Sequence, residues 1–333
     1  MKIRLTQIDG KLPNLALMRL SAWHKARGDA VHFTRSPYRD LFEPSYDRVY
    51  ASSIFTFSAA RIQRLQAEYP GAIIGGTGTN SMLAVESIIG EWSALDYSPY
   101  PKFTASIGFT QRGCRLKCKF CVVPTKEGKP RSVMSIAELW RGAPWPKHLH
   151  LLDNDFFGQD QWRARIAEIK SGGFKVCFNQ GINVRLVTDE IAEALAGLEY
   201  RDDQFRRRRL YTAWDNLKDE EVFFRGVDTL ERHGIPPKHL MVYMLIGFDP
   251  AETWERIFHR FERMVDLGVL PYPMVYDRRR RDLRDFQRWV VTGLYRAVPW
   301  SEYVPNVKRM ARERIAGFEA NAGILEGVSA DAR

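Results

Sequence analysis

Apolar and polar positions alternate with two different periods over roughly the first 95 residues. Short apolar runs that are typical of strands lie at 2–8, 30–34, 47–57 and 72–80. Between them, residues 14–28 and 59–71 space their apolar side chains three and four apart, as helices with one buried face do. This order predicts a small doubly wound sheet of parallel strands in a domain over 1–95. Its ligands would bind beyond the carboxyl ends of the strands.

A second alternation starts at residue 103, after a segment at 91–103 with two prolines that we expect to be a linker. Segments that predict strands lie at 103–110, 148–155, 174–182, 209–215, 240–248 and 271–276. A capping box from Ser135 to Glu138 and a cap at Thr188 support the helices between them. We therefore expect an α/β chain whose second domain, over 96–280, is a partial parallel barrel of six βα units. A helical extension would follow over 281–333. Chemistry in such a barrel lies at the carboxyl ends of the strands.

The net charge and the N-terminal residues indicate which binding partners and which cellular locations suit the chain. A net charge of +10 and a pI near 9.5 suit an anionic partner such as a nucleic acid, although the same charge also serves solubility alone. No run of about 18 apolar residues occurs, and the first residues lack the apolar core of a secretory signal. We expect a cytoplasmic protein with no membrane segment.

Three of the four cysteines stand within the stretch RGCRLKCKFCVVP at 112–124. Thiolates spaced C-x3-C-x2-C on one loop suit a cubane iron–sulfur cluster whose remaining iron is open to another ligand. Structural zinc is an alternative that needs four closed ligands, so His148 or Cys177 would have to supply the fourth. A disulfide framework is not expected, because the cysteines are clustered. Cys177 lies inside a predicted strand and is expected to be an inert buried thiol.

The longer stretch GFTQRGCRLKCKFCVVP resembles the signature of the radical S-adenosylmethionine (radical SAM) superfamily, with Phe120 in its aromatic position. The resemblance covers residues 103 to about 276. It implies that Cys114, Cys118 and Cys121 hold a [4Fe-4S] cluster and that S-adenosylmethionine binds the fourth iron. Reductive cleavage would then give methionine and a 5′-deoxyadenosyl radical that abstracts hydrogen from a substrate. It also implies an electron donor such as flavodoxin or ferredoxin.

Polar residues at the predicted strand ends are candidates to bind S-adenosylmethionine. Asp153 and Asn154 follow the second barrel strand, where the superfamily has a glycine-rich motif that this chain does not match. They could accept a hydrogen bond from the methionyl amino group, or they could cap a turn. Candidates for ribose, carboxylate and adenine contacts are Gln180, Asn183, Arg185, Ile246 and Gly247. Arg185 as an ordinary surface cation is the alternative for that residue.

The N-terminal segment resembles a short cobalamin-binding (Rossmann-like) domain, because the stretch at 12–31 is followed by the glycine-rich AIIGGTGTN. The aspartate-x-histidine-x-x-glycine element of such domains is absent, and His24 is expected to be an ordinary helix residue. Cobalamin remains compatible with the chain. The methylthiotransferase branch shares the stretch FCVVP but needs a second cluster held by N-terminal cysteines. Residues 1–113 contain none, so we expect that branch to be excluded.

Two arginine-rich runs, at 206–209 and 277–289, have two interpretations. Arginines beside Phe286 and Trp289 could bind phosphates and stack on bases, whereas an apolar stripe in 283–294 indicates an amphipathic helix with a solvated basic face. We hypothesise a radical SAM enzyme acting on a nucleoside, a nucleic acid or an anionic metabolite. The alternatives are a cobalamin-dependent radical SAM methyltransferase and a non-catalytic, metal-stabilised nucleic-acid-binding protein.

Overall fold

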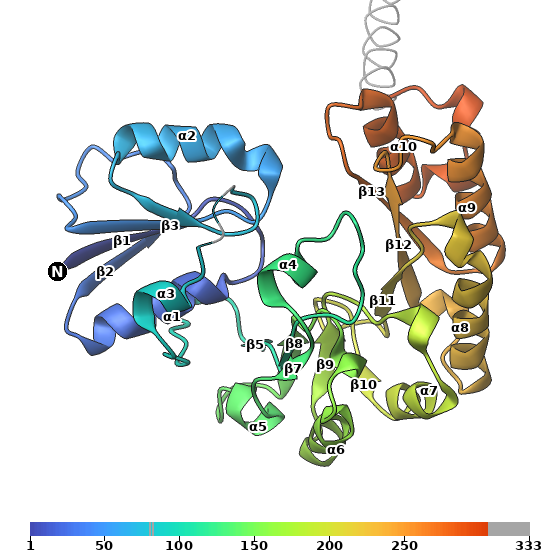
Figure 1. Ribbon diagram of the computed structural model, residues 1–333, viewed down its shortest axis with the longest axis horizontal. Coiled ribbons are helices and arrows are strands. Elements are labelled where there is room, and N and C mark those ends of the chain that lie inside the picture. The colour runs from blue at the N-terminus through green and yellow to red at the C-terminus, as the bar shows by residue number, and fades with distance from the viewer. Residues whose placement is uncertain (80, 82, 306–333) are drawn as a thin grey trace, which may run out of the picture.

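The computed structural model describes residues 1–79, 81 and 83–305, in which a small N-terminal sheet lies beside a larger curved one (Figure 1). Of the helices in this part of the chain, none has the length and apolar character needed to cross a bilayer. The expected extension over 281–333 lies outside the described residues from position 306 onward.

The N-terminal sheet has four parallel strands in the order β2-β1-β3-β4. Their bounds are β1 (Lys2–Gln7), β2 (Ala30–Thr34), β3 (Arg48–Ser52) and β4 (Ile73–Gly75). Helix α1 (Leu15–Ala26) covers one face, and α2 (Ala59–Glu68) covers the other (Figure 1). A short helix, α3 (Glu86–Ile89), adds Ile89 to the core beneath α1. The predicted doubly wound parallel sheet is confirmed.

Strand β3 ends earlier than the sequence predicts, because Asp9 draws the chain away from the sheet. Its carboxylate accepts the backbone N–H of Ile54 at 2.8 Å and that of Phe55 at 3.2 Å. The prediction of a strand over 47–57 is therefore wrong beyond Ser52. A 3-10 turn at Thr56–Ser58 leads instead into α2.

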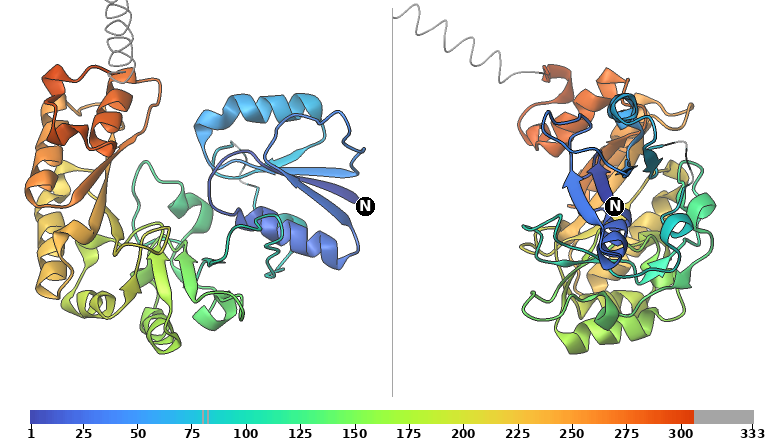
Figure 2. Two further views of the ribbon diagram at one scale, coloured as in Figure 1. Left: turned by 180° about the vertical axis from the view of Figure 1, so that it is seen from behind. Right: turned by 90° about the vertical axis from the view of Figure 1, so that its left-hand side faces the viewer.

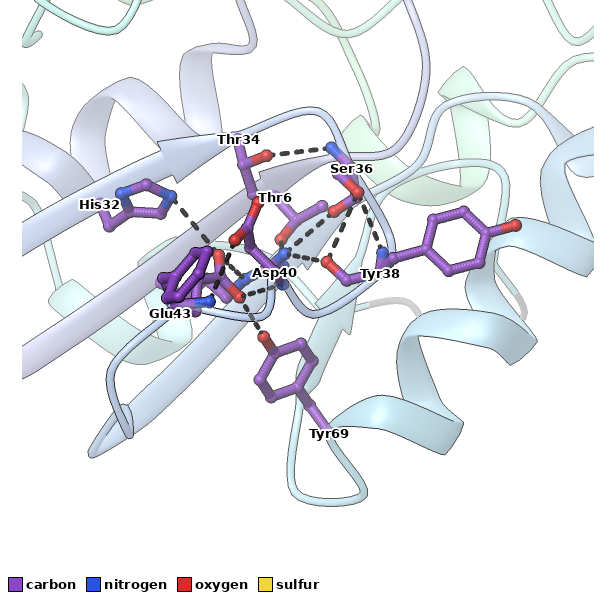
Figure 3. A network of polar contacts seen from close by, with 10 residues as sticks. Thr6, His32, Thr34, Ser36, Tyr38, Asp40, Glu43 and Tyr69 are labelled. Carbon is purple, nitrogen blue, oxygen red and sulfur yellow. Dashed lines mark hydrogen bonds and ion pairs between the residues drawn. The ribbon is translucent and has the colours of Figure 1, made fainter.

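A buried arginine fixes the connection from β2 to β3, which contains no helix. Arg4 of β1 is fully buried, and its guanidinium donates to Glu43 at 3.2 Å and to the carbonyls of Ser36 and Tyr38 at 3.1 and 2.9 Å. Glu43 also accepts from the Tyr69 hydroxyl at 2.6 Å (Figure 3). A buried charge of this kind needs such partners, so the network holds the connection against the sheet.

After residue 95, seven parallel strands of the described chain form a partial barrel in two hydrogen-bonded groups. Six of them correspond to the predicted strands. Their bounds are β5 (Ser106–Gly108), β8 (His148–Leu151), β9 (Lys175–Phe178), β11 (Leu210–Ala213), β12 (Leu240–Ile246) and β13 (Leu270–Val275). Pairing runs β10-β9-β8-β5 and β11-β12-β13, with β10 (Glu199–Tyr200) at the edge of the first group. The two groups meet where the N–H of Ile182 donates to the carbonyl of Tyr211 at 2.7 Å. No pairing joins β5 to β13 among the described residues, so the barrel is open there.

Helices cover the outer side of this curved sheet (Figure 2). They are α5 (Ile136–Leu139), α6 (Trp162–Gly172), α7 (Asp189–Ala196), α8 (Glu220–Arg232) and α9 (Trp254–Asp266). The predicted capping box from Ser135 to Glu138 and the Thr188 cap are both present. Phe223, Val227 and Leu230 of α8 are fully buried, as their spacing predicts.

Helix α10 (Arg281–Val291) settles the two interpretations of the second arginine run. Leu283, Phe286, Trp289 and Val290 are all buried against the barrel. The amphipathic-helix interpretation is therefore confirmed. Phe286 and Trp289 are not free to stack on bases.

Candidate active site at the cysteine loop

The cysteine loop leaves the carboxyl end of β5 and is closed at its base by a small hairpin of β6 (Gln111–Arg112) and β7 (Arg131–Ser132). Helix α4 (Val123–Glu127) lies between these strands. Gly113 has φ +89°, and a Cβ there would lie 2.2 Å from the carbonyl oxygen of Lys129. Only glycine fits at this entry to the loop.

Cys114, Cys118 and Cys121 are free and partly exposed on this loop. Burial raises the pKa of the Cys114 and Cys121 thiols, and the nearby Cys118 contributes in the same direction. Within the described part of the chain, no three His, Cys, Asp or Glu side chains converge closely enough to share one metal ion. Each thiolate ligand of a cubane cluster binds a different iron, so this donor set does not need to converge on one point. Three thiols on one loop are the kind of donors that such a cluster binds.

Asp155 ties the middle of the cysteine loop to the end of β8. Its carboxylate accepts from Nε and Nη2 of Arg115 at 2.7 and 2.9 Å, and from the Arg115 backbone N–H at 3.1 Å. Arg115 stands immediately after Cys114. A bidentate pair of this kind fixes orientation as well as distance, so the loop has a defined position over β8.

Asp153 braces the start of the same loop. Its buried carboxylate accepts from the backbone N–H and hydroxyl of Thr110, at 2.7 and 2.5 Å, and from the N–H of Gln111 at 3.1 Å. Burial raises the pKa of Asp153 to about 7, against the effect of these hydrogen bonds. Both carboxylate oxygens of Asp153 already accept hydrogen bonds, so its side chain caps the turn at Thr110 and Gln111, which is the second of the two roles considered for it. Asn154, by contrast, donates to Glu127 at 3.1 Å and lines an open cleft.

The candidates after β9 lie at the next strand end. Arg185 donates to Asp219 at 2.9 Å and to Oδ1 of Asn183 at 3.2 Å, so it is a paired cation. The Nδ2 of Asn183 is buried and has no partner among the described residues. Gln180 is exposed and lines the same cleft as Asn154.

The end of β12 approaches the cysteine loop through two aromatic rings. Phe120 contacts Phe248 edge to face, with ring centroids 5.5 Å apart. Gly247, beside Phe248, has φ +77°, and its N–H donates to Glu252 at 2.6 Å. The side chain of Ile246 is buried in the core, so only its backbone could meet an adenine. The roles assigned to these residues from the sequence remain predictions.

Two acidic residues of this site were missed from the sequence. Glu127 accepts from Arg112 at 3.0 Å, from the N–H of Gly113 at 3.1 Å and from Asn154. Asp215 accepts from the N–H of Leu245 at 2.9 Å, and burial raises its pKa. Asp215 is the last residue of the predicted strand at 209–215, so the rule that finds Asp153 could also have found it. Glu127 follows no strand, and no sequence signal marks it.

A cleft of about 1860 Å³ lies between the N-terminal sheet and the barrel. One wall contains Arg112, Glu127, Asn154 and Gln180 from the barrel side. The opposite wall is formed by the segments that follow β1, β3 and β4, at the carboxyl ends of the N-terminal sheet. Both sheets thus present their strand ends to one space, which is large enough for a nucleotide or a bigger ligand.

Comparison with known proteins finds one informative similarity. The chain is 25% identical over 193 residues to tRNA-2-methylthio-N(6)-dimethylallyladenosine synthase of Sulfurihydrogenibium sp. (strain YO3AOP1). The match covers 51% of this chain and 41% of that protein, so the chain spans less than half of its relative. No family model and no solved structure matches the chain. The chain is thus a distant homologue of a radical SAM methylthiotransferase.

Proposed function

We propose that this protein is a radical SAM enzyme that abstracts hydrogen from a nucleic acid. The observation that carries the proposal is the set of three free thiols on one loop at the carboxyl end of the first barrel strand. The distant similarity to a radical SAM enzyme supports it.

In this proposal Cys114, Cys118 and Cys121 hold a [4Fe-4S] cluster. When bound, that group supplies the electron that divides S-adenosylmethionine into methionine and a 5′-deoxyadenosyl radical. The surrounding residues keep the three thiols in place: Gly113 permits the turn, and Arg115 with Asp155 anchors the loop to β8. Such bracing gives the ligands the fixed geometry that a cluster site requires.

We assign the binding of S-adenosylmethionine to side chains that keep free polar groups. Asn154 and Gln180 line the cleft beside the loop, and the unpartnered Nδ2 of Asn183 can donate to a ribose or carboxylate oxygen. Phe120 and the backbone at Ile246 and Gly247 offer an apolar, close approach for the adenine. Asp153 and Arg185 act indirectly in this assignment, because their polar groups are already paired.

The proposed substrate is a nucleic acid. Its support is the net charge of +10 and the similarity to an enzyme named for a modified tRNA base. We do not extend methylthio transfer to this chain, since residues 1–113 contain no cysteine that could hold a second cluster.

A cobalamin-dependent methyltransferase is the second candidate, favoured by the parallel N-terminal sheet and the cleft at its strand ends. His24 does not fit as an axial ligand of cobalt. It is fully buried, with Nδ1 2.7 Å from Asp29 and Nε2 3.4 Å from the Tyr50 hydroxyl. We derive no step through cobalamin. An electron donor such as flavodoxin or ferredoxin and a cytoplasmic location complete the proposal.

The experiment uses the full chain, purified and reconstituted with iron and sulfide without oxygen. With dithionite and S-adenosylmethionine, the formation of 5′-deoxyadenosine is followed with and without added cobalamin. Cys118→Ala should abolish cleavage and reduce bound iron. Cys177→Ala is the matched control, because Cys177 is fully buried in β9, away from the loop, and should keep both. Tightly bound zinc with no cleavage would instead indicate a metal-stabilised nucleic-acid-binding protein.

A further inference from the structure

Two stacked phenylalanine rings lie in the segment that follows β3, on the wall of the cleft. Phe55 and Phe57 have ring centroids 4.9 Å apart and ring planes 12° from parallel. They are 42% and 56% exposed, and both line the cleft. Exposed aromatic rings cost solvation free energy, so a stacked pair kept open in a cleft indicates a ligand with a flat apolar face.

The backbone beneath these rings is held in place. Asp9 accepts the N–H of Phe55 and the hydroxyl of Ser53, the latter at 2.7 Å. A Cβ on Gly78 would lie 2.5 Å from the backbone of Phe55, so the glycine-rich loop after β4 packs directly against it. The rings are therefore preorganised, which lowers the entropy cost of binding.

One arginine contacts the pair, and two others, Arg35 and Arg61, line the same cleft. Arg278 lies with its Cζ 4.8 Å from the centre of the Phe57 ring, although it comes from the segment between β13 and α10. Arg35 donates to the carbonyl of Gly10 at 3.0 Å, and Arg61 donates to the carbonyl of Arg35 at 2.8 Å. All three arginines are exposed and form no ion pair with a described carboxylate. Their charge is available for an anionic ligand.

We propose that this aromatic patch (Phe55 and Phe57 with Arg35, Arg61 and Arg278) binds an unpaired segment of a nucleic-acid strand. The proposal rests on the proposed function and places the substrate strand in its cleft. A base stacks on the open phenylalanine surface, and the guanidinium groups bind the flanking phosphates. An unpaired strand is required because the bases of a duplex have no exposed face to stack.

The run at 206–209 is not part of this surface. It precedes β11 and so lies at the amino end of the barrel strands, whereas the cleft lies at their carboxyl ends. Arg208 donates to Glu199 at 2.9 Å, and Arg209 donates to the carbonyl of Lys238 at 3.0 Å. Only Arg278 of the two arginine-rich runs reaches the aromatic patch.

The test measures the binding of a labelled 12-nucleotide single-stranded RNA to the full chain by fluorescence anisotropy. Phe55→Ala should weaken binding about tenfold, because stacking of one base contributes about 1–3 kcal/mol. Phe55→Trp should instead bind the RNA about as tightly as the unaltered chain, because tryptophan keeps a ring for stacking. Phe42→Ala is the matched control, since Phe42 is 90% exposed but does not line the cleft, and it should have no effect.

Charge is tested with the same RNA. Arg61→Gln should lower the slope of log affinity against log salt concentration by about 0.7, the value expected for one phosphate of a single strand. Equal affinity of the Phe55→Ala variant, or equal affinity for the duplex form of the RNA, would overturn the proposal. So would binding of hydroxocobalamin that Phe55→Ala abolishes, because the patch would then serve a corrin ring. RNA binding without formation of 5′-deoxyadenosine would refute the proposed chemistry and leave the patch intact.

Discussion

At the scale of single residues, the strongest constraint on the sequence is that each charged side chain buried by the fold needs an ionic partner. Arg4 cannot lose its proton, and it has no access to water. Glu43, with an 8% exposed side chain, is its ionic partner. Removing one member of such a pair leaves the other charge uncompensated, which costs more than the pair itself contributes.

Arg4→Met should therefore destabilise the N-terminal domain by about 3 kcal/mol, as buried pairs usually do when one partner is removed. The measurement is the urea midpoint of the transition reported by the two tryptophans of that domain, Trp23 and Trp92, which both pack against its core. Arg232→Gln, which breaks exposed pairs with Asp228 and Asp189, is the control and should change stability by about 0.5 kcal/mol or less. The double variant Arg4→Met/Glu43→Gln should recover part of the loss. A double variant less stable than Arg4→Met alone would contradict the pairing.

The same network should make the N-terminal domain sensitive to acid. Burial opposes ionisation of Glu43, but hydrogen bonds from Tyr69 and Arg4 outweigh it and hold the pKa of Glu43 below its ordinary value. A depressed pKa contributes stability above the unfolded value, about 4.5, and that stability is lost as the pH falls through the folded pKa. Thermal melts from pH 6 to pH 3 should show this loss. The slope should be shallower for Glu43→Gln, and an unchanged slope would show that another carboxyl is responsible.

At the scale of elements, the sequence predicted those with long or buried apolar runs. The strand predicted at 240–248 is observed at 240–246, and helices α8 and α9 bury the faces expected of them. Strands β6 and β7 and helix α4, with two to five residues, were missed because none is long enough to repeat a periodic pattern. The cysteines of the site were found by their spacing. The contacts of Glu127 were not, because they depend on how the loop folds back in space.

The turn at Gly113 gives a prediction for the cysteine loop as an element. Gly113→Ala should displace the loop, because its backbone conformation is strained for alanine and the Cβ meets Lys129. The reconstituted variant should retain less iron per chain, while its far-UV circular dichroism is unchanged. Gly71→Ala is the control, since a Cβ there meets nothing within 4 Å. Full iron content in Gly113→Ala would show that the turn does not position the ligands.

At the scale of the whole molecule, the core and the proposed cluster site are separate. The main core lies between the barrel strands and their outer helices, and none of its buried side chains belongs to residues 112–124. The fold of the barrel should therefore not depend on the metal, unlike small domains that a metal holds together.

Removing iron from the reconstituted chain with a chelator should shift its thermal midpoint by no more than about 3 °C, the change expected for about 1 kcal/mol in a chain of this size. Differential scanning calorimetry before and after chelation provides the measurement. A much larger drop would mean that the cysteine loop is part of the folding core.

The contact between Phe57 and Arg278 joins an early and a late part of the chain. During synthesis the N-terminal sheet can form as soon as its own residues have left the ribosome, because domains fold largely in that order. The edge of the cleft at Arg278 forms only after the segment that follows β13 has been synthesised. On every nascent chain the two phenylalanines are therefore synthesised and exposed before Arg278 is made. The complete binding site for the nucleic-acid strand forms only when the barrel has folded.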